Sequence, residues 1–203
     1  MKFDPKQLER WMSLVRTHPD GIQAFWPSQI QAKAWIVDVY RSYRMPTIDK
    51  MIIFGSWYGV LADMFPWTKE ITCVDAGPER YLEWCSQKYS TWGGCMSKYA
   101  YESTPDVVIN TVTEHVSQEI YDEWFENIPE GVIYIVQGNN DTEEPDHIRA
   151  CKDLDEFKRL NTPSDTKYMN SLPRDQEIEY EGPWDHLNNK KQTFKRFMLI
   201  GEK

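Results

Sequence analysis

The sequence predicts an α/β fold in which helices cover both faces of a doubly wound, mostly parallel, seven-stranded sheet whose last strands are antiparallel. From residue 50 onward, short apolar runs alternate with helical stretches, which is typical of a sheet built from strand–helix–strand units. After residue 137 this alternation stops, and the chain ends in two apolar runs with no helix between them. No repeat of about 20 to 50 residues is present, which excludes solenoids and linked modules.

Two helices are expected before the first strand. Asp4 caps the first helix, Pro5 occupies its first position, and apolar residues recur at helical spacing as far as Val15. The second helix begins near Pro27 and ends before Pro46. We expect residues 1–46 to form a helical cap over a ligand pocket and residues 47–203 to form the sheet and its helices. Together they make a single domain of 203 residues.

Strands and helices are expected to alternate along the rest of the chain. The predicted strands are residues 50–54, 71–75, 98–101, 106–111, 132–137, 177–180 and 194–200, and the predicted helices are residues 59–65, 78–89, 118–127 and 153–160. Two prolines support the helix bounds, because proline is tolerated in a first helical turn and breaks a helix interior. Pro66 follows the first of these helices, and Pro78 opens the second. The last two strands are predicted to form an antiparallel hairpin.

The charge of the chain argues against a protein that coats nucleic acid. The 23 Lys and Arg residues and 32 Asp and Glu residues give a formal net charge of −9, whereas phosphate binding needs basic stripes. Sequence-specific DNA is therefore not an expected partner. The longest apolar runs are far shorter than the roughly 18 residues of a membrane span. The amino terminus lacks the apolar segment of a signal peptide, so a cytoplasmic protein without membrane association is expected.

The cysteines and histidines do not predict a metal site. The four cysteines show no CxxC spacing, and the four histidines are scattered along the chain. Structural zinc sites use closely spaced ligand pairs, so no metal is expected and the cysteines are interpreted as reduced thiols.

A turn that contains two glycines follows the first predicted strand. Residues 51–62 are Met-Ile-Ile-Phe-Gly-Ser-Trp-Tyr-Gly-Val-Leu-Ala, which places Gly55 at the exit from the strand and Gly59 at the start of the helix. Asp75 stands twenty residues after Gly55, at the end of the next apolar run, where a carboxylate accepts hydrogen bonds from ribose hydroxyls. This spacing favours a cofactor bound at a helix amino terminus, although glycine also occurs at such turns for steric reasons alone.

Polar residues stand at the carboxyl end of the fourth predicted strand, where ligands of open α/β sheets bind. They are Asn110, Thr111, Glu114 and His115. His115 is a candidate general base, because an imidazole with a pKa near 6.5 removes protons at neutral pH, and Glu114 is a candidate wall of the same pocket. Both also have a structural interpretation, as a hydrogen-bonded histidine and as an acid near a helix amino terminus.

The loop after the fifth predicted strand adds three candidates for substrate contact. Residues 137–147 are rich in side chains that favour turns, and the loop lies over the carboxyl edge of the predicted sheet. Its candidates are Asn139, Asn140 and His147. The alternative is a surface loop without function.

These motifs resemble those of a known family. Residues 55–62 resemble the nucleotide-binding motif of class I S-adenosylmethionine-dependent methyltransferases. Asp106-Val-Val-Ile-Asn, with Glu114-His-Val, resembles the fourth-strand signature of their small-molecule branches, and residues 128–136 resemble the turn and fifth strand of the same Rossmann-like fold. Over residues 28–203 the chain is also similar to small methyltransferase-like proteins of tailed bacteriophages.

The resemblance implies S-adenosylmethionine as the cofactor and methyl transfer to a small-molecule or nucleotide-type acceptor. In that reaction His115 and Glu114 are the candidate catalytic residues. The residues that the resemblance implies for cofactor contact are Gly55, Ser56, Trp57, Tyr58, Gly59, Asp75, Ala76, Asn110 and Thr111. The sequence departs from the family pattern at two positions, because Ile53 stands in place of an acid and Trp57 in place of the middle glycine.

Other functions are compatible with parts of the sequence. The departures at Ile53 and Trp57 also suit a catalytically degenerate protein of the same fold that binds a nucleoside ligand or a host protein. A nicotinamide-dependent dehydrogenase shares the turn and the acid, but the glycine spacing and the antiparallel last strands argue against it. DNA base methylation is disfavoured, because the chain has neither an NPPY-type motif nor a Pro-Cys dipeptide.

Overall fold

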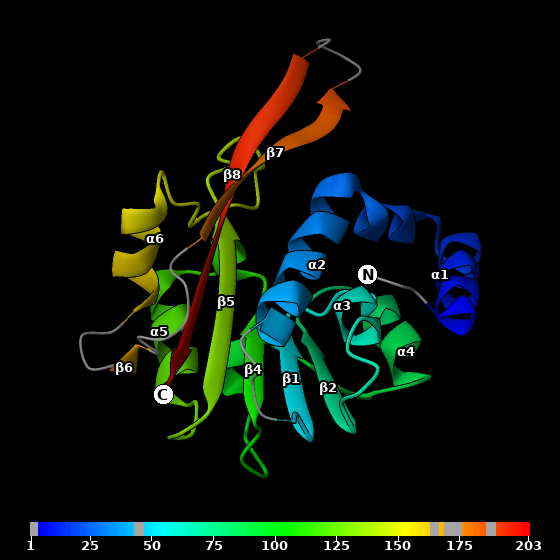
Figure 1. The fold of residues 1–203 in the computed structure, drawn as a ribbon, viewed down its shortest axis with the longest axis horizontal. Coiled ribbons are helices and arrows are strands. Elements are labelled where there is room, and N and C mark those ends of the chain that lie inside the picture. Colours follow the sequence, from blue (N-terminus) through cyan, green and yellow to red (C-terminus); the bar gives the residue numbers. More distant parts are fainter. Residues whose placement is uncertain (1–3, 43–46, 163–166, 169–175, 186–189) are drawn as a thin grey trace.

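The strands of the described chain form one sheet. The structure is a computed structural model, and it describes residues 4–42, 47–162, 167–168, 176–185 and 190–203. The strands are β1 (Lys50–Phe54), β2 (Glu70–Asp75), β3 (Ser90–Gly93), β4 (Val107–Asn110), β5 (Ile133–Asn139), β6 (Lys167–Tyr168), β7 (Gln176–Asp185) and β8 (Lys190–Glu202). Their order is β3-β2-β1-β4-β5-β8-β6, and β7 pairs with β8 (Figure 1).

The sheet has the predicted doubly wound architecture. β1 to β5 are parallel, and Ile53 of the central strand β1 stands opposite Cys73 of β2 and Ile109 of β4. β8 runs antiparallel between β5 and β6 and forms the predicted hairpin with β7, which extends beyond the other strands in Figure 1. The strand order reverses between β1 and β4, so their carboxyl ends form a topological switch point, where ligands bind in this architecture.

Two details of the sheet differ from the prediction. The third strand is Ser90–Gly93 rather than residues 98–101, and the described residues form eight strands rather than seven. β3 lies at the sheet edge and has Trp92 as its one large apolar residue, so it lacks a periodic apolar pattern. Tyr99 and Tyr101 instead pack against the core after the 3-10 segment η2 (Met96–Lys98). The additional strand, β6, has only two residues.

Helices precede the sheet and connect its strands. They are α1 (Pro5–Thr17), α2 (Pro27–Ser42), α3 (Val60–Asp63), α4 (Glu79–Ser86), α5 (Gln118–Glu126) and α6 (Leu154–Asn161), with the 3-10 segments η1 (Pro19–Phe25) and η3 (Thr113–His115). Asp4, Ser117 and Asp153 accept backbone hydrogen bonds at the starts of α1, α5 and α6, as expected of helix-capping residues. In the described ranges, no helix combines the length and apolarity that crossing a membrane requires.

Each face of the sheet has its own hydrophobic core, because successive side chains of a strand point to opposite faces. Ile53 shares one core with Leu14 and Ile36, on the face covered by α1 to α4. The next residue, Phe54, points to the opposite face and packs against Trp124 of α5, with ring centroids 5.4 Å apart. Figure 1 shows α5 and α6 on this second side of the sheet.

A buried carboxylate joins the first helix to the helices of the sheet. Asp63 of α3 is 2% exposed and accepts hydrogen bonds from Arg10 Nε at 3.3 Å and Trp11 Nε1 at 3.0 Å. It also accepts from Lys88 Nζ at 2.9 Å and from the Tyr89 hydroxyl at 2.6 Å. Two cations and two neutral donors therefore compensate one buried charge. These contacts fix α3, and with it the end of the loop that leads from β1.

Candidate cofactor pocket and acceptor site

The loop from β1 to α3 has a backbone conformation that glycine favours. Gly55 and Gly59 have φ of 70°, and Trp57 has φ of 48°. The backbone N–H groups of Gly55 and Ser56 both donate to the carbonyl of Val74, at 3.0 and 3.1 Å. The loop therefore turns across the carboxyl ends of β1 and β2.

Asp75, at the end of β2, connects two loops. Its Oδ2 accepts a hydrogen bond from the backbone N–H of Trp57 at 2.7 Å, and its Oδ1 accepts one from the N–H of Gly77, also at 2.7 Å. A carboxylate offers about four acceptor positions, so two remain for a ligand. Asp75 is half-buried and combines a structural role in the glycine loop with free acceptor capacity.

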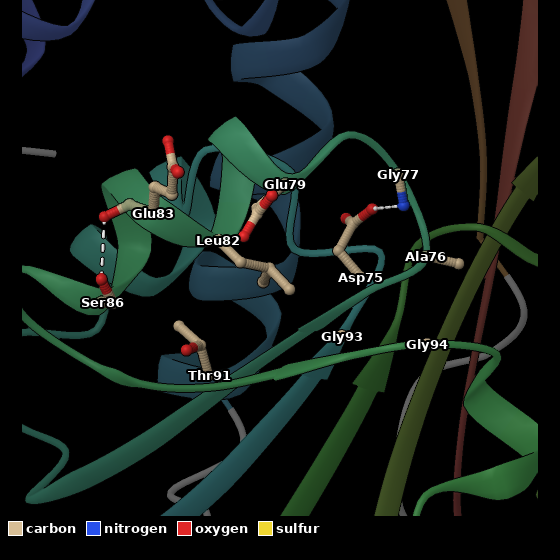
Figure 2. Close-up of a pocket in the computed structure, with 10 residues that line it drawn as sticks. All are labelled: Asp75, Ala76, Gly77, Glu79, Leu82, Glu83, Ser86, Thr91, Gly93 and Gly94. Carbon is tan, nitrogen blue, oxygen red and sulfur yellow. Dashed lines mark hydrogen bonds between the residues drawn. The ribbon is translucent and has the colours of Figure 1, made fainter.

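A pocket of about 530 Å³ opens beside Asp75 (Figure 2). Ligand pockets typically have volumes of roughly 300–1,000 Å³. Figure 2 shows Leu82 pointing from α4 toward the strands, where it forms an apolar wall. Three of the lining residues are carboxylates, and none is lysine or arginine. The full lining is Asp75, Ala76, Gly77, Glu79, Leu82, Glu83, Ser86, Thr91, Gly93 and Gly94, of which the sequence predicted Asp75 and Ala76.

The predicted cofactor residues of the glycine loop direct their side chains into the protein. Ser56 is 4% exposed, with its hydroxyl near the thiol of Cys73. Tyr58 is fully buried, its hydroxyl donates to Asp20 at 2.9 Å, and burial raises its pKa to about 12. The indole of Trp57 packs against the core on the α1 to α4 face. What this loop offers a ligand is therefore its backbone.

Val112 connects the glycine loop with the end of β4. A Cβ added at Gly55 would lie 2.1 Å from Val112 Cγ1. Position 55 therefore requires glycine for two reasons, its positive φ and the closeness of Val112. Thr111 Oγ1 donates to the carbonyl of Gly55 at 3.1 Å, and the buried side chain of Asn110 accepts from the N–H of Val112 at 3.0 Å. Asn110 and Thr111, both predicted to contact a cofactor, thus hold the end of β4 against the glycine loop.

Four of the five residues predicted for catalysis and substrate contact lie together at the carboxyl ends of β4 and β5. The carboxylate of Glu114 accepts a hydrogen bond from Asn139 Nδ2, and the rings of His115 and His147 meet edge to face with centroids 4.7 Å apart. Glu114 and Asn139 are buried, His147 is half-buried and His115 is exposed. The fifth residue, Asn140, accepts a hydrogen bond from the backbone of β8 at 2.7 Å instead. We call Glu114, His115, Asn139 and His147 the acceptor cluster.

Arg149 supports the loop that contains His147, and sequence reasoning missed it. Its guanidinium donates to Gln118 Oε1 at 2.8 Å, to the carbonyl of Thr113 at 3.0 Å and to Asn161 Oδ1 at 2.9 Å. It also lies 4.2 Å from the ring centroid of Tyr121. Burial lowers the pKa of this arginine. Its partners stand as far as 36 residues away, so no local pattern indicated this role.

Lys33 of α2 is a second residue that sequence reasoning missed. Burial, together with the charge of Arg196, lowers the pKa of Lys33 to about 7. The amine of Lys33 donates to Gln29 Oε1 at 2.9 Å, one turn earlier in α2. The neighbouring carbonyl of Ala32 accepts a hydrogen bond from Gln137 of β5 at 3.0 Å. α2 therefore contacts the sheet in the carboxyl-terminal half of β5.

The fold, unlike the sequence, matches known proteins. No protein-family model and no curated protein matches the sequence. N-methyltransferase NodS from Bradyrhizobium japonicum, in complex with S-adenosyl-L-homocysteine, matches with a TM-score of 0.64 and 10% identity, covering 96% of this chain and 99% of NodS.

Two further solved structures show the same similarity. TehB from Haemophilus influenzae matches with a TM-score of 0.62 and 14% identity, over 82% of this chain and 61% of TehB. An S-adenosylmethionine-dependent methyltransferase from Clostridium acetobutylicum matches with a TM-score of 0.56 and 10% identity, over 84% of this chain and 90% of that one. Together with the strand order and the terminal hairpin, these neighbours show that the protein has the Rossmann-like fold of class I S-adenosylmethionine-dependent methyltransferases.

Proposed function

We propose that the protein is an S-adenosylmethionine-dependent methyltransferase that acts on a small-molecule or nucleotide-type acceptor. The observation that carries this proposal is the position of Asp75, which ends β2, holds the glycine loop and lines the pocket. A carboxylate at this place accepts hydrogen bonds from ribose hydroxyls. NodS, which has the same fold, binds S-adenosyl-L-homocysteine in its crystal structure.

The charge of the pocket favours this cofactor over one that contains phosphate. S-adenosylmethionine carries a sulfonium and an ammonium group, whereas a nicotinamide dinucleotide carries a pyrophosphate. Asp75, Glu79 and Glu83 would attract the former and repel the latter, and no lysine or arginine lines the pocket to compensate a phosphate. Leu82 supplies apolar surface for an adenine ring. The donor set therefore fits S-adenosylmethionine better than NAD.

The residues of the chain would hold the two reactants in line. When bound, S-adenosylmethionine would supply an activated methyl group for transfer to a lone pair of the acceptor. We propose that Asp75 and the backbone of residues 55–59 hold the cofactor and that the acceptor cluster contacts the acceptor. The two parts adjoin, because Val112 packs against Gly55 and directly precedes η3, which contains Glu114 and His115. Holding reactants in such an arrangement supplies most of the catalysis that methyl transfer needs.

The chain's charge favours a small acceptor over nucleic acid. A net charge of −9 repels phosphate backbones, whereas the acceptor cluster offers carboxylate, amide and imidazole groups that bind hydroxyl or amino groups. We further propose that the protein acts as a single domain in the cytoplasm.

Calorimetric titration with S-adenosylmethionine, S-adenosylhomocysteine and NAD tests this function. We expect the first two to bind with dissociation constants on the order of 1–100 μM and NAD not to bind. If the folded protein binds neither of the first two, the proposal is wrong. That result would favour the catalytically degenerate binding protein suggested by Ile53 and Trp57.

A further inference from the structure

Three side chains that bind metals converge beyond the ends of β4 and β5. One ligand atom from each of Glu114, His115 and His147 lies within 4.8 Å of the other two. Two ligands of a tetrahedral zinc ion stand about 3.3 Å apart, so small side-chain rotations suffice to close the site. We propose that Glu114, His115 and His147 bind one divalent transition-metal ion. This site goes beyond the proposed function and does not depend on it.

His147 is already oriented as a metal ligand. Its Nδ1 lies 2.7 Å from the carbonyl oxygen of Asp141. A carbonyl oxygen only accepts hydrogen bonds, so Nδ1 bears a proton, and in the neutral imidazole Nε2 then keeps its lone pair for a metal. Histidine ligands of metals usually donate their other ring N–H to a carbonyl or carboxylate, which fixes the tautomer and the ring. The contact with Asp141 is a bond of this kind.

The same segment orients Glu114. The side-chain N–H of Asn139 donates to Glu114 Oε1, and Asn139 Oδ1 in turn accepts from the backbone N–H of Asp141 at 2.9 Å. Asp141 therefore positions His147 through its carbonyl and Glu114 through its N–H. Such supporting bonds are typical of metal sites, whose ligating carboxylates are themselves hydrogen-bonded.

The charge of Glu114 also calls for a cation. Its side chain is buried, the residue being 3% exposed, and no salt bridge within the described ranges includes it. The positive charge of Arg149 acts on Glu114 from a distance, but the hydrogen bonds of its guanidinium go to Gln118, Thr113 and Asn161. A buried carboxylate is costly unless a cation or a metal compensates it. A divalent ion bound by the three side chains would supply that compensation.

Two imidazoles and one carboxylate suit zinc and similar transition metals better than magnesium or calcium, which prefer oxygen ligands. His115 is exposed, so the fourth position of a tetrahedral ion is accessible from solvent.

An acceptor hydroxyl or amine bound there would lose its proton more readily. A lone pair that binds a metal does not accept a proton, so His115 becomes a ligand in place of the general base expected from the sequence.

Metal titration of the full-length chain, first freed of metal with a chelator, tests this site. Zn²⁺ is added in competition with a chromophoric chelator, and Co²⁺ binding is followed by absorption spectroscopy. We expect one Zn²⁺ per chain and a Co²⁺ spectrum of nitrogen and oxygen ligands. A thiolate charge-transfer band would show that cysteines bind the metal and would overturn the proposal, as would the absence of stoichiometric binding.

Single substitutions identify the ligands. His115→Gln, His147→Gln and Glu114→Gln are each expected to weaken Zn²⁺ binding by at least about tenfold. His18→Gln is the matched control, because His18 lies after α1, where its ring contacts Trp84, and it is expected to leave binding unchanged. His115 is exposed, so His115→Gln keeps the test valid even if the Glu114 variant fails to fold.

Two outcomes with these variants would refute the metal site: wild-type affinity in His115→Gln, or an equal loss in His18→Gln. The readout needs neither cofactor nor methyl transfer. A protein that binds Zn²⁺ at these residues but no S-adenosylhomocysteine would therefore refute the proposed function and leave the metal site in place.

Discussion

The carboxylate of Asp75 accepts a hydrogen bond from the backbone N–H of Trp57 at 2.7 Å. Trp57 has φ of 48°, a left-handed conformation that costs a residue other than glycine roughly 1–2 kcal/mol. A hydrogen bond to a charged group contributes about 1.5–3 kcal/mol and offsets that cost. The backbone thus takes the shape expected of glycine, while the half-buried indole packs against the core and does not line the pocket.

Gly55→Ala is expected to destabilise the protein by about 2–4 kcal/mol. The new Cβ would meet Val112 Cγ1 at 2.1 Å, and alanine is also strained at φ of 70°. Denaturant unfolding measures the change. Gly131→Ala is the matched control, because Gly131 has φ of 78° and nothing within 4 Å of an added Cβ, so it should cost only about 1 kcal/mol.

Adding Val112→Ala to Gly55→Ala separates the two causes. Val112→Ala removes both Cγ atoms and leaves Cβ 2.9 Å from the new methyl, so Gly55→Ala should cost less in the Val112→Ala background than in the wild type, but still more than the backbone strain of about 1 kcal/mol. An equal cost of Gly55→Ala in the wild type and in Val112→Ala would show that Val112 is not the residue that requires glycine at position 55.

Asp63→Asn is expected to lower the free energy of unfolding by about 3–5 kcal/mol. The substitution leaves Arg10 and Lys88 facing a neutral side chain in a buried site and places an amide N–H against two of the four donors. Thermal or denaturant unfolding measures the loss. Asp155→Asn, at an exposed carboxylate in the first turn of α6, should cost less than about 1 kcal/mol. Similar losses in both variants would contradict a central role for Asp63.

Lys33 is expected to make stability depend on pH between its folded and unfolded pKa values. Its pKa falls from 10.5 to about 7 in the folded protein through burial and the charge of Arg196, so the unfolded chain binds more protons in this range. The free energy of unfolding is therefore highest above about pH 10.5, where Lys33 is neutral in both states. It decreases as the pH falls toward 7, by up to roughly 4 kcal/mol, because only the unfolded chain takes up the proton in this range.

Lys33→Met should remove this part of the pH dependence. The free energy of unfolding of both proteins is measured at about pH 7 and about pH 9.5. Relative to the wild type, Lys33→Met should be more stable at pH 7 than it is at pH 9.5. Lys6→Met, at an exposed lysine, is the control and should behave as wild type. A constant difference between Lys33→Met and wild type across this range would show that Lys33 has an ordinary pKa.

Most of the fold was predictable from the sequence because its central strands are buried. β1, β4 and β5 are continuous apolar runs, and such runs are typical of parallel strands covered on both faces. β3 is an edge strand whose residues are mostly exposed, so it had no apolar signal. The aromatic residues 99 and 101 suggested a strand, although their side chains fill the core beside it.

The candidate site was predictable where its signals are local. The positions of Gly55 and Asp75 follow from the strand ends, and the structure joins their loops through hydrogen bonds. Side-chain directions were not predictable, since Tyr58 turns inward to a partner 38 residues away, Asp20. The convergence of His115 and His147 also required the pairing of β4 with β5, so ligand spacing alone predicted no metal site.

Titration of S-adenosylhomocysteine into wild type, Asp75→Ala and Asp106→Ala tests the cofactor site most directly. Asp106 is a matched control, because its carboxylate accepts backbone hydrogen bonds from Asp49 at 2.8 Å and Lys50 at 2.9 Å at the opposite edge of the sheet. We expect Asp75→Ala to weaken binding by about 1–3 kcal/mol, or about 5- to 150-fold, and Asp106→Ala to bind as wild type. Wild-type affinity in Asp75→Ala would remove Asp75 from the site and contradict the proposed function.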